Sequence, residues 1–243
     1  MERRDFFKVV TSGAAAVAIG PSLISTTLYA HDGRLYNSYE KVQLTDKDGK
    51  PLKASSLEAE ENYIFNYPFV GTPAMLLNLP DTCKEPVSLK SAEGDEYIWN
   101  EGSGSKKTIV AYAAICTHSL THPNKSESFF SYLKKGGKTM ACKGSGVIVC
   151  SSHLSAFEPK CGAKNIAGPA DQPLAAIVLE HNEADDTLHA VGVLGADKYH
   201  DYFKAFRTEM KKEWGGRRKA KKKVQNSAIV SKLNEYTKEV IQY

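Results

Sequence analysis

The sequence predicts an all-β domain with an extension at each end. Three observations lead to this fold class: apolar runs of strand length, Pro- and Gly-containing loops between them, and two Cys/His pairs at the ends of such runs. Many short strands separated by turn residues are typical of β-sandwiches and barrels. The 243 residues allow one well-buried domain plus extensions, and a composition with 42% hydrophobic and 25% charged residues is that of a globular protein.

The N-terminal residues have the pattern of an export signal. Arg3-Arg4-Asp5-Phe6-Phe7-Lys8 precedes an uncharged segment, residues 9–30. A charged head followed by an apolar run is typical of targeting segments, and the paired arginines resemble a twin-arginine signal. A chance Arg-Arg pair ahead of a buried helix is the alternative. We therefore assign residues 1–30 to a twin-arginine signal or membrane-anchor helix, with the protein exported to the periplasmic face. Leu28-Tyr29-Ala30 is a poor cleavage site, which favours an uncleaved anchor.

The next residues are expected to lead from a linker into the first strands. Residues 31–61 are mostly polar and contain one short strand candidate, residues 41–45, so we interpret them as a linker. Strand-type runs follow at residues 62–67, 74–79 and 107–115, and the last ends at the first Cys/His pair.

A β-hairpin is expected to close the domain. Residues 175–180 and 187–194 are strand-type runs around a turn-like Asn/Asp-rich segment. The predicted β domain therefore spans residues 62–198.

Residues 199–243 are predicted to form a basic helical tail. Apolar residues recur at helical spacing twice, before and after a run of seven residues with six Lys or Arg. Residues 200–243 contain 12 Lys/Arg and 5 Asp/Glu, a net charge of +7, so the basic character of the chain lies here. A solvated helix face is one interpretation; contact with an acidic protein or anionic lipid is another. Nucleic acid is not expected to bind an exported chain.

Two short motifs carry the chemistry, Cys116-Thr117-His118 and Cys150-Ser151-Ser152-His153. Each offers one thiolate and one imidazole, so Cys116, His118, Cys150 and His153 are candidate metal ligands. Buried structural residues without metal, a zinc site and a two-iron cluster are the three alternatives. Because each motif mixes Cys with His, the pattern favours a cluster in which one iron takes both thiolates and the other takes both imidazoles.

The two motifs resemble the cluster-binding loops of Rieske iron–sulfur proteins, and residues 168–174 resemble the proline loop of that family. Over the β domain the chain is most similar to the small subunit of arsenite oxidase, whereas the proline loop is more similar to that of cytochrome bc-type complexes. The resemblance implies a Rieske-type antiparallel β-sandwich with a cluster-binding subdomain and one [2Fe-2S] cluster. Cys116 and Cys150 would hold the inner iron, His118 and His153 the outer, exposed iron, and Ser155 would donate a hydrogen bond to the cluster.

The chain departs from the family pattern at three positions. Thr121 and Ser152 stand where disulfide-bearing members have cysteines, and Phe157 stands where high-potential members have Tyr. With fewer hydrogen bonds to stabilise the reduced cluster, the resemblance implies a reduction potential below that of quinol-oxidising members that keep both features. Cys142 and Cys161, which flank the second motif, could form a replacement disulfide after export.

For two features between the motifs, the resemblance to the Rieske family does not imply a role. His122 is interpreted as a surface histidine, or as a loop residue that tunes the cluster. The long inter-loop segment contains Phe129, Phe130 and Tyr132, which indicate either a docking surface or a satellite core.

The sequence therefore predicts one-electron transfer, with no substrate turned over by this chain alone and no catalytic residue. The expected partner is a larger redox subunit, a membrane cytochrome or a quinone, in a quinol-oxidising bc-type complex or as the small subunit of a periplasmic molybdenum oxidase of the arsenite oxidase type. A zinc-stabilised binding module is the alternative of another class. A Rieske-type oxygenase is disfavoured because only about fifty residues follow the β domain, too few for a catalytic iron domain.

Overall fold

The computed structural model describes residues 35–82 and 85–243. The predicted export signal or anchor, residues 1–30, lies outside the described residues. In the part of the chain that is described, no helix combines the length and the apolar character needed to cross a bilayer.

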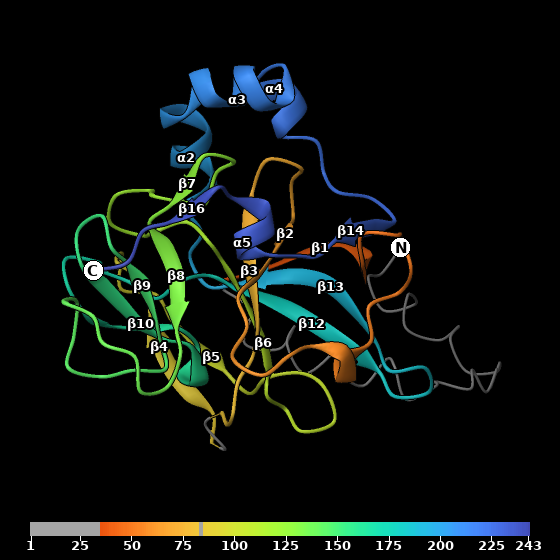
Figure 1. Ribbon diagram of the computed structural model, residues 1–243, viewed down its shortest axis with the longest axis horizontal. Helices are drawn as coiled ribbons and strands as arrows, with labels where there is room; N and C mark the ends of the chain where they lie inside the picture. The colour runs from red at the N-terminus through yellow and green to blue at the C-terminus, as the bar shows by residue number, and fades with distance from the viewer. Residues whose placement is uncertain (1–34, 83–84) are drawn as a thin grey trace, which may run out of the picture. The chain divides into compact units, whose positions relative to one another are not determined.

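An eight-stranded sheet forms the centre of the fold (Figure 1). Its strand order is β14-β1-β13-β12-β6-β3-β2-β15. The bounds are β1 Tyr36–Thr45, β2 Tyr63–Asn66, β3 Pro73–Asn78, β6 Ile109–Ala113, β12 Ala176–Asn182, β13 Thr187–Leu194, β14 Ser227–Ile229 and β15 Ser231–Lys232. All of its pairs are antiparallel except β1 with β14. The all-β fold class is therefore confirmed, as is the closing hairpin, β12–β13.

A second sheet of four strands carries the other half of the candidate site. Its order is β11-β10-β9-β8, and all of its pairs are antiparallel. The bounds are β8 Phe130–Leu133, β9 Val147–Cys150, β10 Ser155–Glu158 and β11 Lys164–Ala167. Two further pairs complete the described strands: β4 Val87–Lys90 with β5 Glu96–Trp99, and β7 Glu127–Ser128 with β16 Glu239–Val240.

The expected linker is part of the main sheet instead. β1 pairs with β13 along one side and with β14 along the other. The buried side chains of Val42 and Leu44 fix one face of the strand in the core. Only the 3₁₀ helix η1, Ala54–Ser56, and the turns around it remain between β1 and β2. The strand candidate at residues 41–45 is therefore confirmed as the second half of β1, whereas the linker interpretation is wrong for residues 36–40, which extend the same strand.

The predicted helical tail is mainly helical in its first half, and its second half contains a single helical turn. Helices α2 Tyr199–Ala205, α3 Arg207–Trp214 and α4 Arg217–Ala220 are followed by strands β14 and β15, the one-turn helix α5 Leu233–Tyr236, and β16. The strands β14 and β15 form the two ends of the main sheet, and β16 pairs with β7. The second amphipathic helix is thus wrong, because the backbone of this segment pairs with three separate strands.

The hydrophobic core unites the main sheet with α2–α4. Phe65 and Leu76 from the sheet are buried with Phe203, Met210 and other apolar residues of the helices, and each of these four is at most 2% exposed. Burying a side chain of this size stabilises the fold by about 1.5–3 kcal/mol. The C-terminal helices are therefore an integral layer of the domain.

Candidate metal centre

The first Cys/His pair lies in the loop that follows β6. Cys116 is buried and His118 is exposed. The Leu120 N–H donates to the Cys116 carbonyl oxygen at 2.9 Å, and the Cys116 N–H donates to the Thr121 carbonyl oxygen at 2.8 Å. These two hydrogen bonds close a tight turn that holds the cysteine inside and presents the histidine to solvent.

The second pair lies in the tight turn between β9 and β10. Cys150 ends β9, is buried, and stands opposite Ser155 at the start of β10. His153 is exposed at the tip. Leu120 and Leu154, each four residues after a ligand cysteine, have φ values of +60° and +59°. A left-handed conformation costs a non-glycine residue roughly 1–2 kcal/mol, so both loops are held in shape by their surroundings.

The structure brings the two thiols together and the two imidazoles together. A hydrogen bond with the Cys150 thiol, helped by the backbone N–H groups of Ser119 and His118, lowers the pKa of Cys116 against the opposing effect of burial. The same hydrogen bond and burial raise the pKa of Cys150. The His118 and His153 rings lie 5.1 Å apart between centroids, at 86°. The four candidate ligands are thus sorted into a buried sulfur pair and an exposed nitrogen pair.

This sorting fits a two-iron cluster. In a Rieske-type centre one iron takes two thiolates and the other takes two imidazoles, whereas tetrahedral zinc takes all four donors on one ion. Ser155 is fully buried, and its Oγ has no hydrogen-bond partner in the described part of the chain. Such a hydroxyl can donate to a cluster sulfur, the role that Ser155 is predicted to have.

The proline loop, residues 168–174, holds both cluster loops. The Thr117 hydroxyl donates to the Gln172 carbonyl oxygen at 3.0 Å. Gly168 has φ +78°, and a Cβ there would lie 2.3 Å from the Leu154 carbonyl oxygen, so only glycine allows this approach to the second loop. Gln172 is itself fixed, because its side chain donates to Ala196 at 2.9 Å.

The structure shows the contacts of the three residues that depart from the family pattern. Thr121 Oγ1 lies 2.9 Å from Ser119 Oγ, and its hydroxyl contacts the Cys150 thiol. Ser152 Oγ lies 3.3 Å from His153 Nδ1. The Phe157 ring is fully buried, with its centroid 6.4 Å from that of Phe130, and brings no hydroxyl to the site. Of the two positions that lack the family's disulfide cysteines, Thr121 therefore contacts the other loop through its hydroxyl, whereas the hydroxyl of Ser152 contacts a residue of its own loop.

The proposed disulfide between Cys142 and Cys161 is wrong. Cys142 has a free thiol whose sulfur lies 3.7 Å from the Gly144 carbonyl oxygen, whereas Cys161 is disulfide-bonded. Cys161 ends the 3₁₀ helix η2, Pro159–Cys161, directly after β10. A disulfide therefore exists close to the site, but not between the two cysteines that flank the second motif.

The interpretation of His122 as a surface histidine is wrong. Its side chain is 4% exposed, its Nδ1 lies 2.9 Å from the Leu120 carbonyl oxygen, and its Nε2 lies 2.7 Å from Glu209 Oε1 on α3. The rings of Tyr202 and Phe206 meet it edge-on, at 4.7 and 4.6 Å between centroids. The first cluster loop is thus tied to the C-terminal helices.

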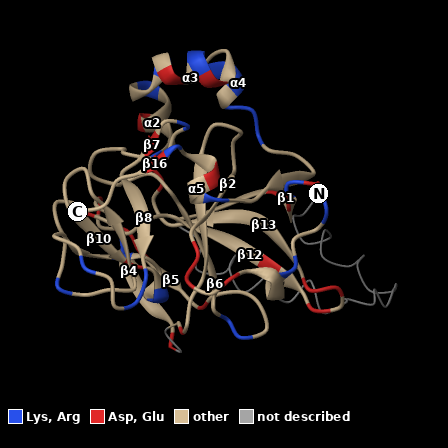
Figure 2. Cartoon of the chain, viewed as in Figure 1, with Lys and Arg blue, Asp and Glu red and all other residues tan. Residues whose placement is uncertain are grey.

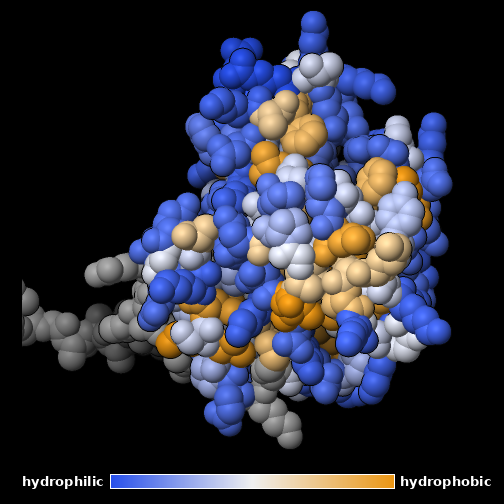
Figure 3. All heavy atoms as spheres, turned by 90° about the vertical axis from the view of Figure 1, so that its left-hand side faces the viewer, coloured by the Kyte–Doolittle hydropathy of each residue, from blue (hydrophilic) through white to orange (hydrophobic). Residues whose placement is uncertain are grey.

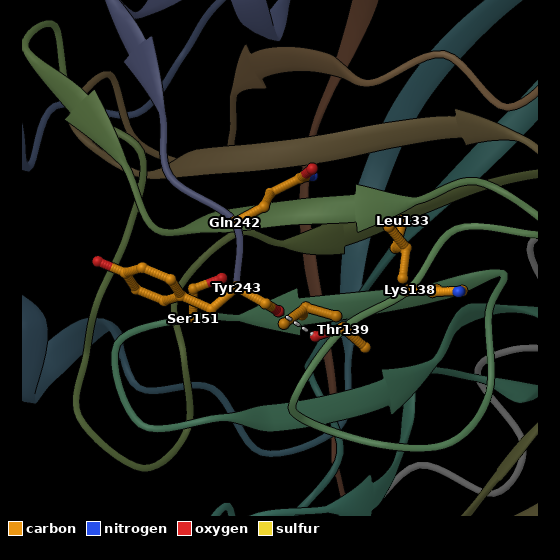
Figure 4. Close-up of a pocket in the computed structure, with 7 residues that line it drawn as sticks. Leu133, Lys138, Thr139, Ser151, Gln242 and Tyr243 are labelled. Carbon is orange, nitrogen blue, oxygen red and sulfur yellow. Dashed lines mark hydrogen bonds between the residues drawn. The ribbon is translucent and has the colours of Figure 1, made fainter.

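The inter-loop segment packs as a satellite core. Phe130 and Tyr132 are buried in β8, and the Tyr132 hydroxyl donates to Glu60 at 2.9 Å. Figure 4 shows a pocket over β8 and β9 where the Thr139 hydroxyl donates to the Tyr243 backbone oxygen at 2.7 Å. The pocket's free volume of about 10 Å³ is about what one water molecule needs. The aromatic residues of the segment therefore serve packing.

The comparison with protein families agrees with a two-iron cluster. Residues 77–178 match the family model of the Rieske [2Fe-2S] domain. Among solved structures, the chain is similar to the soluble domain of the Rieske protein II (soxF) from Sulfolobus acidocaldarius. The identity is 20% over 65% of this chain and 82% of that chain, with a TM-score of 0.42. The finer similarity to the arsenite oxidase small subunit stays a prediction. Residues 77–178 of this chain form a Rieske [2Fe-2S] domain, which binds one two-iron cluster and transfers electrons through it.

Proposed function

We propose that this chain is the electron-transferring Rieske subunit of an exported respiratory complex, of the quinol-oxidising bc type. The observation that carries the electron-transfer part is the sorting of the ligands, with Cys116 and Cys150 buried together and His118 and His153 exposed together. The exposed imidazoles can meet a quinol or a partner's redox centre. Because they are ionisable, proton transfer can accompany electron transfer there.

The bc-type assignment is supported by the proline loop. Its resemblance to bc-type sequences is accompanied by contacts with both cluster loops, through Thr117 and Leu154. A second candidate is the small subunit of a periplasmic molybdenum oxidase of the arsenite oxidase type, which is favoured by the sequence resemblance across the β domain. In either case the partner is a larger redox subunit, and this chain alone turns over no substrate.

Export to the periplasmic face, with residues 1–30 as twin-arginine signal or anchor, belongs to the same proposal. The disulfide at Cys161 supports it, because disulfides persist in oxidising compartments. The test is fractionation of cells that make the full chain. Replacing Arg3 and Arg4 by Lys is expected to leave the protein in the cytoplasm, and unchanged export of that variant would contradict the twin-arginine assignment.

The cluster and the complex are tested separately. Iron and acid-labile sulfide are expected in equal amounts, with a paramagnetic signal on one-electron reduction; zinc without sulfide would overturn the electron-transfer function. Purification of the tagged chain from gently solubilised membranes then decides between complexes. Co-purifying b- and c-type haem supports the bc type, and a molybdenum-containing subunit supports the second candidate.

A further inference from the structure

The C-terminal helices lie beside the first cluster loop. The contact between Glu209 and His122 joins α3 to that loop, six residues after Cys116. Helices rise 1.5 Å per residue, so the end of α3 at Trp214 is only about 8 Å further along the helix axis. The helices α3 and α4 therefore belong to the surroundings of the cluster.

The outer side of these helices is strongly basic. Residues 204–223 contain ten Lys or Arg and two Glu, a net charge of +8, and all ten basic residues are exposed. In the described part of the chain, none of the ten forms an ion pair with a carboxylate. Figure 2 shows the basic residues along α3 and α4 at one end of the molecule. We call these ten side chains the basic surface.

The acidic residues of α3 have the opposite orientation. Glu209 contacts His122, and burial together with the charge of Glu209 raises the pKa of the Glu213 carboxyl, while His122 and Lys125 oppose that shift. The carboxylates thus face the inter-loop segment, and the cations face solvent. This segregation leaves the positive field of the basic surface uncompensated on its outer side.

The apolar side of the helices is already occupied. Met210 and Ala220 are fully buried, and a Cβ at Gly71 would lie 2.8 Å from the Ala220 Cβ, which shows how closely α4 packs on the β2–β3 turn. Helices that lie in a membrane surface insert an apolar face among the lipids. Figure 3 shows a mainly hydrophilic surface at the level of these helices, with a small group of hydrophobic side chains within it and larger groups lower on the same face. The basic surface is therefore better suited to a charged protein than to insertion into lipid.

We propose that the basic surface is a docking site for an acidic redox protein that exchanges electrons with the cluster. A standard protein interface buries about 800 Å² on each partner, a patch roughly 30 Å across. A partner seated on α3 and α4 would therefore also cover the first cluster loop. The [2Fe-2S] cluster that Cys116, His118, Cys150 and His153 would hold would supply one electron to a one-electron acceptor in the partner, with no bond made or broken. The inference rests on the electron-transfer function proposed above.

The test compares two triple variants with the same change in charge. Arg217, Arg218 and Lys219 are replaced by Glu in the first, and Lys135, Lys138 and Lys143, exposed residues of the β8–β9 connection away from α4 (Figure 1), are replaced in the second. Stopped-flow measurement follows the reduction of an acidic c-type cytochrome by the reduced holoprotein, with a basic c-type cytochrome for comparison. Both variants must keep the wild-type reduction potential and paramagnetic spectrum.

For the wild type, the rate constant with the acidic cytochrome is expected to fall as ionic strength rises. At low ionic strength, the rate constant with the acidic cytochrome is expected to be at least tenfold lower for the first variant than for the wild type. For the second variant it is expected to be less than twofold lower. Equal losses in the two variants, or none in either, would overturn the docking proposal alone. Failure of the reduced holoprotein to pass electrons to either cytochrome would instead contradict the electron-transfer function itself.

Sedimentation with phosphatidylglycerol vesicles measures whether the basic surface binds anionic lipid instead of a protein. The proposal expects weak vesicle binding that differs little between the two triple variants. Tight wild-type binding that only the α4 variant loses, together with an unchanged rate toward the acidic cytochrome, would show that the basic surface serves a membrane and not a protein.

Discussion

The contact between His122 and Glu209 offers the sharpest test of how the cluster loop is held. Both ring nitrogens face acceptor oxygens, the Leu120 carbonyl at Nδ1 and the Glu209 carboxyl at Nε2. A neutral ring has only one N–H and an ionised carboxyl has none, so both contacts are hydrogen bonds only if the pair carries one additional proton, on the ring or on the carboxyl. Replacing Glu209 by Ala leaves Nε2 buried without its partner, which costs about 1–3 kcal/mol.

Replacing Glu209 by Gln keeps a partner for Nε2, because the amide N–H can donate to Nε2 while Nδ1–H of the neutral ring donates to the Leu120 carbonyl oxygen. Its loss of stability is therefore expected to be the smaller of the two. The control is Glu235→Ala, because Glu235 is an exposed carboxylate of the same C-terminal segment, 2.7 Å from Lys47. An exposed ion pair contributes about 0–1 kcal/mol. Urea unfolding monitored by tryptophan fluorescence measures all three differences in unfolding free energy.

The functional measurement is the rate at which a chelator removes iron from the holoprotein. If His122 holds the first cluster loop through α3, Glu209→Ala is expected to lose iron several times faster than the wild type, and Glu235→Ala at the wild-type rate. Equal losses of stability in Glu209→Ala and Glu235→Ala, together with equally slow release of iron, would refute the reasoning. The contact between His122 and Glu209 would then not hold the first cluster loop.

Three further predictions concern the cluster and the domain. Phe157→Tyr is expected to raise the reduction potential by adding a hydroxyl to a fully buried ring; the wild-type potential itself is expected below the upper end of the family span of roughly −150 to +300 mV. Ser155→Ala is expected to lower the potential, and an unchanged value in a redox titration followed by electron paramagnetic resonance would count against its predicted hydrogen bond. Hydrogen bonds from the Ser55 hydroxyl and N–H, with His181, lower the pKa of Asp186 to about 2. The folded-state pKa lies below the unfolded one, so its contribution to stability is present above about pH 4 and is lost as pH falls toward 2. Asp186→Asn is therefore expected to differ from wild type in urea midpoint at pH 6 and to approach it near pH 2, whereas a constant difference would contradict this origin.

The candidate site was largely predictable because its signals are local. Each Cys/His motif follows a strand-type run and precedes a turn, so the ligands were expected at strand ends, as the structure has them after β6 and β9. The sorting of the ligands by type was expected from the mixed motifs and the family resemblance, but the local sequence does not show which contacts produce it. That sorting depends on the pairing of Ser155 with Cys150 and on the turn that buries Cys116, and both are tertiary features.

The two segments that were misjudged share a physical cause. β1 has mostly polar residues and only its last residues are buried, so its alternation is weak although its backbone pairs on both sides. In the C-terminal segment, Ile229 is 56% exposed in spite of its place in a helical pattern. Strand pairing there is decided by the backbone of distant strands, which overrides local periodicity.

His122 shows how a signal in the tail could have indicated the contact. Tyr202, Phe206 and Glu209 follow one another at spacings of four and three residues, so a helix places them on one face. A carboxylate on an otherwise aromatic, core-facing stripe requires a buried polar partner, since an unpaired buried charge is costly. The sequence could therefore have indicated that such a partner exists, although its identity, 87 residues away in the chain, needed the fold.

The contact between His122 and Glu209 also connects the basic surface to the cluster loops. On one side the proline loop joins the two cluster loops through Thr117 and Leu154, and on the other side Glu209 joins the first loop to α3. The first cluster loop is thus held on both sides, and cations of the basic surface stand on α3, the helix that holds it. Positioning of the ligands and attraction of an acidic partner thus use opposite faces of α3.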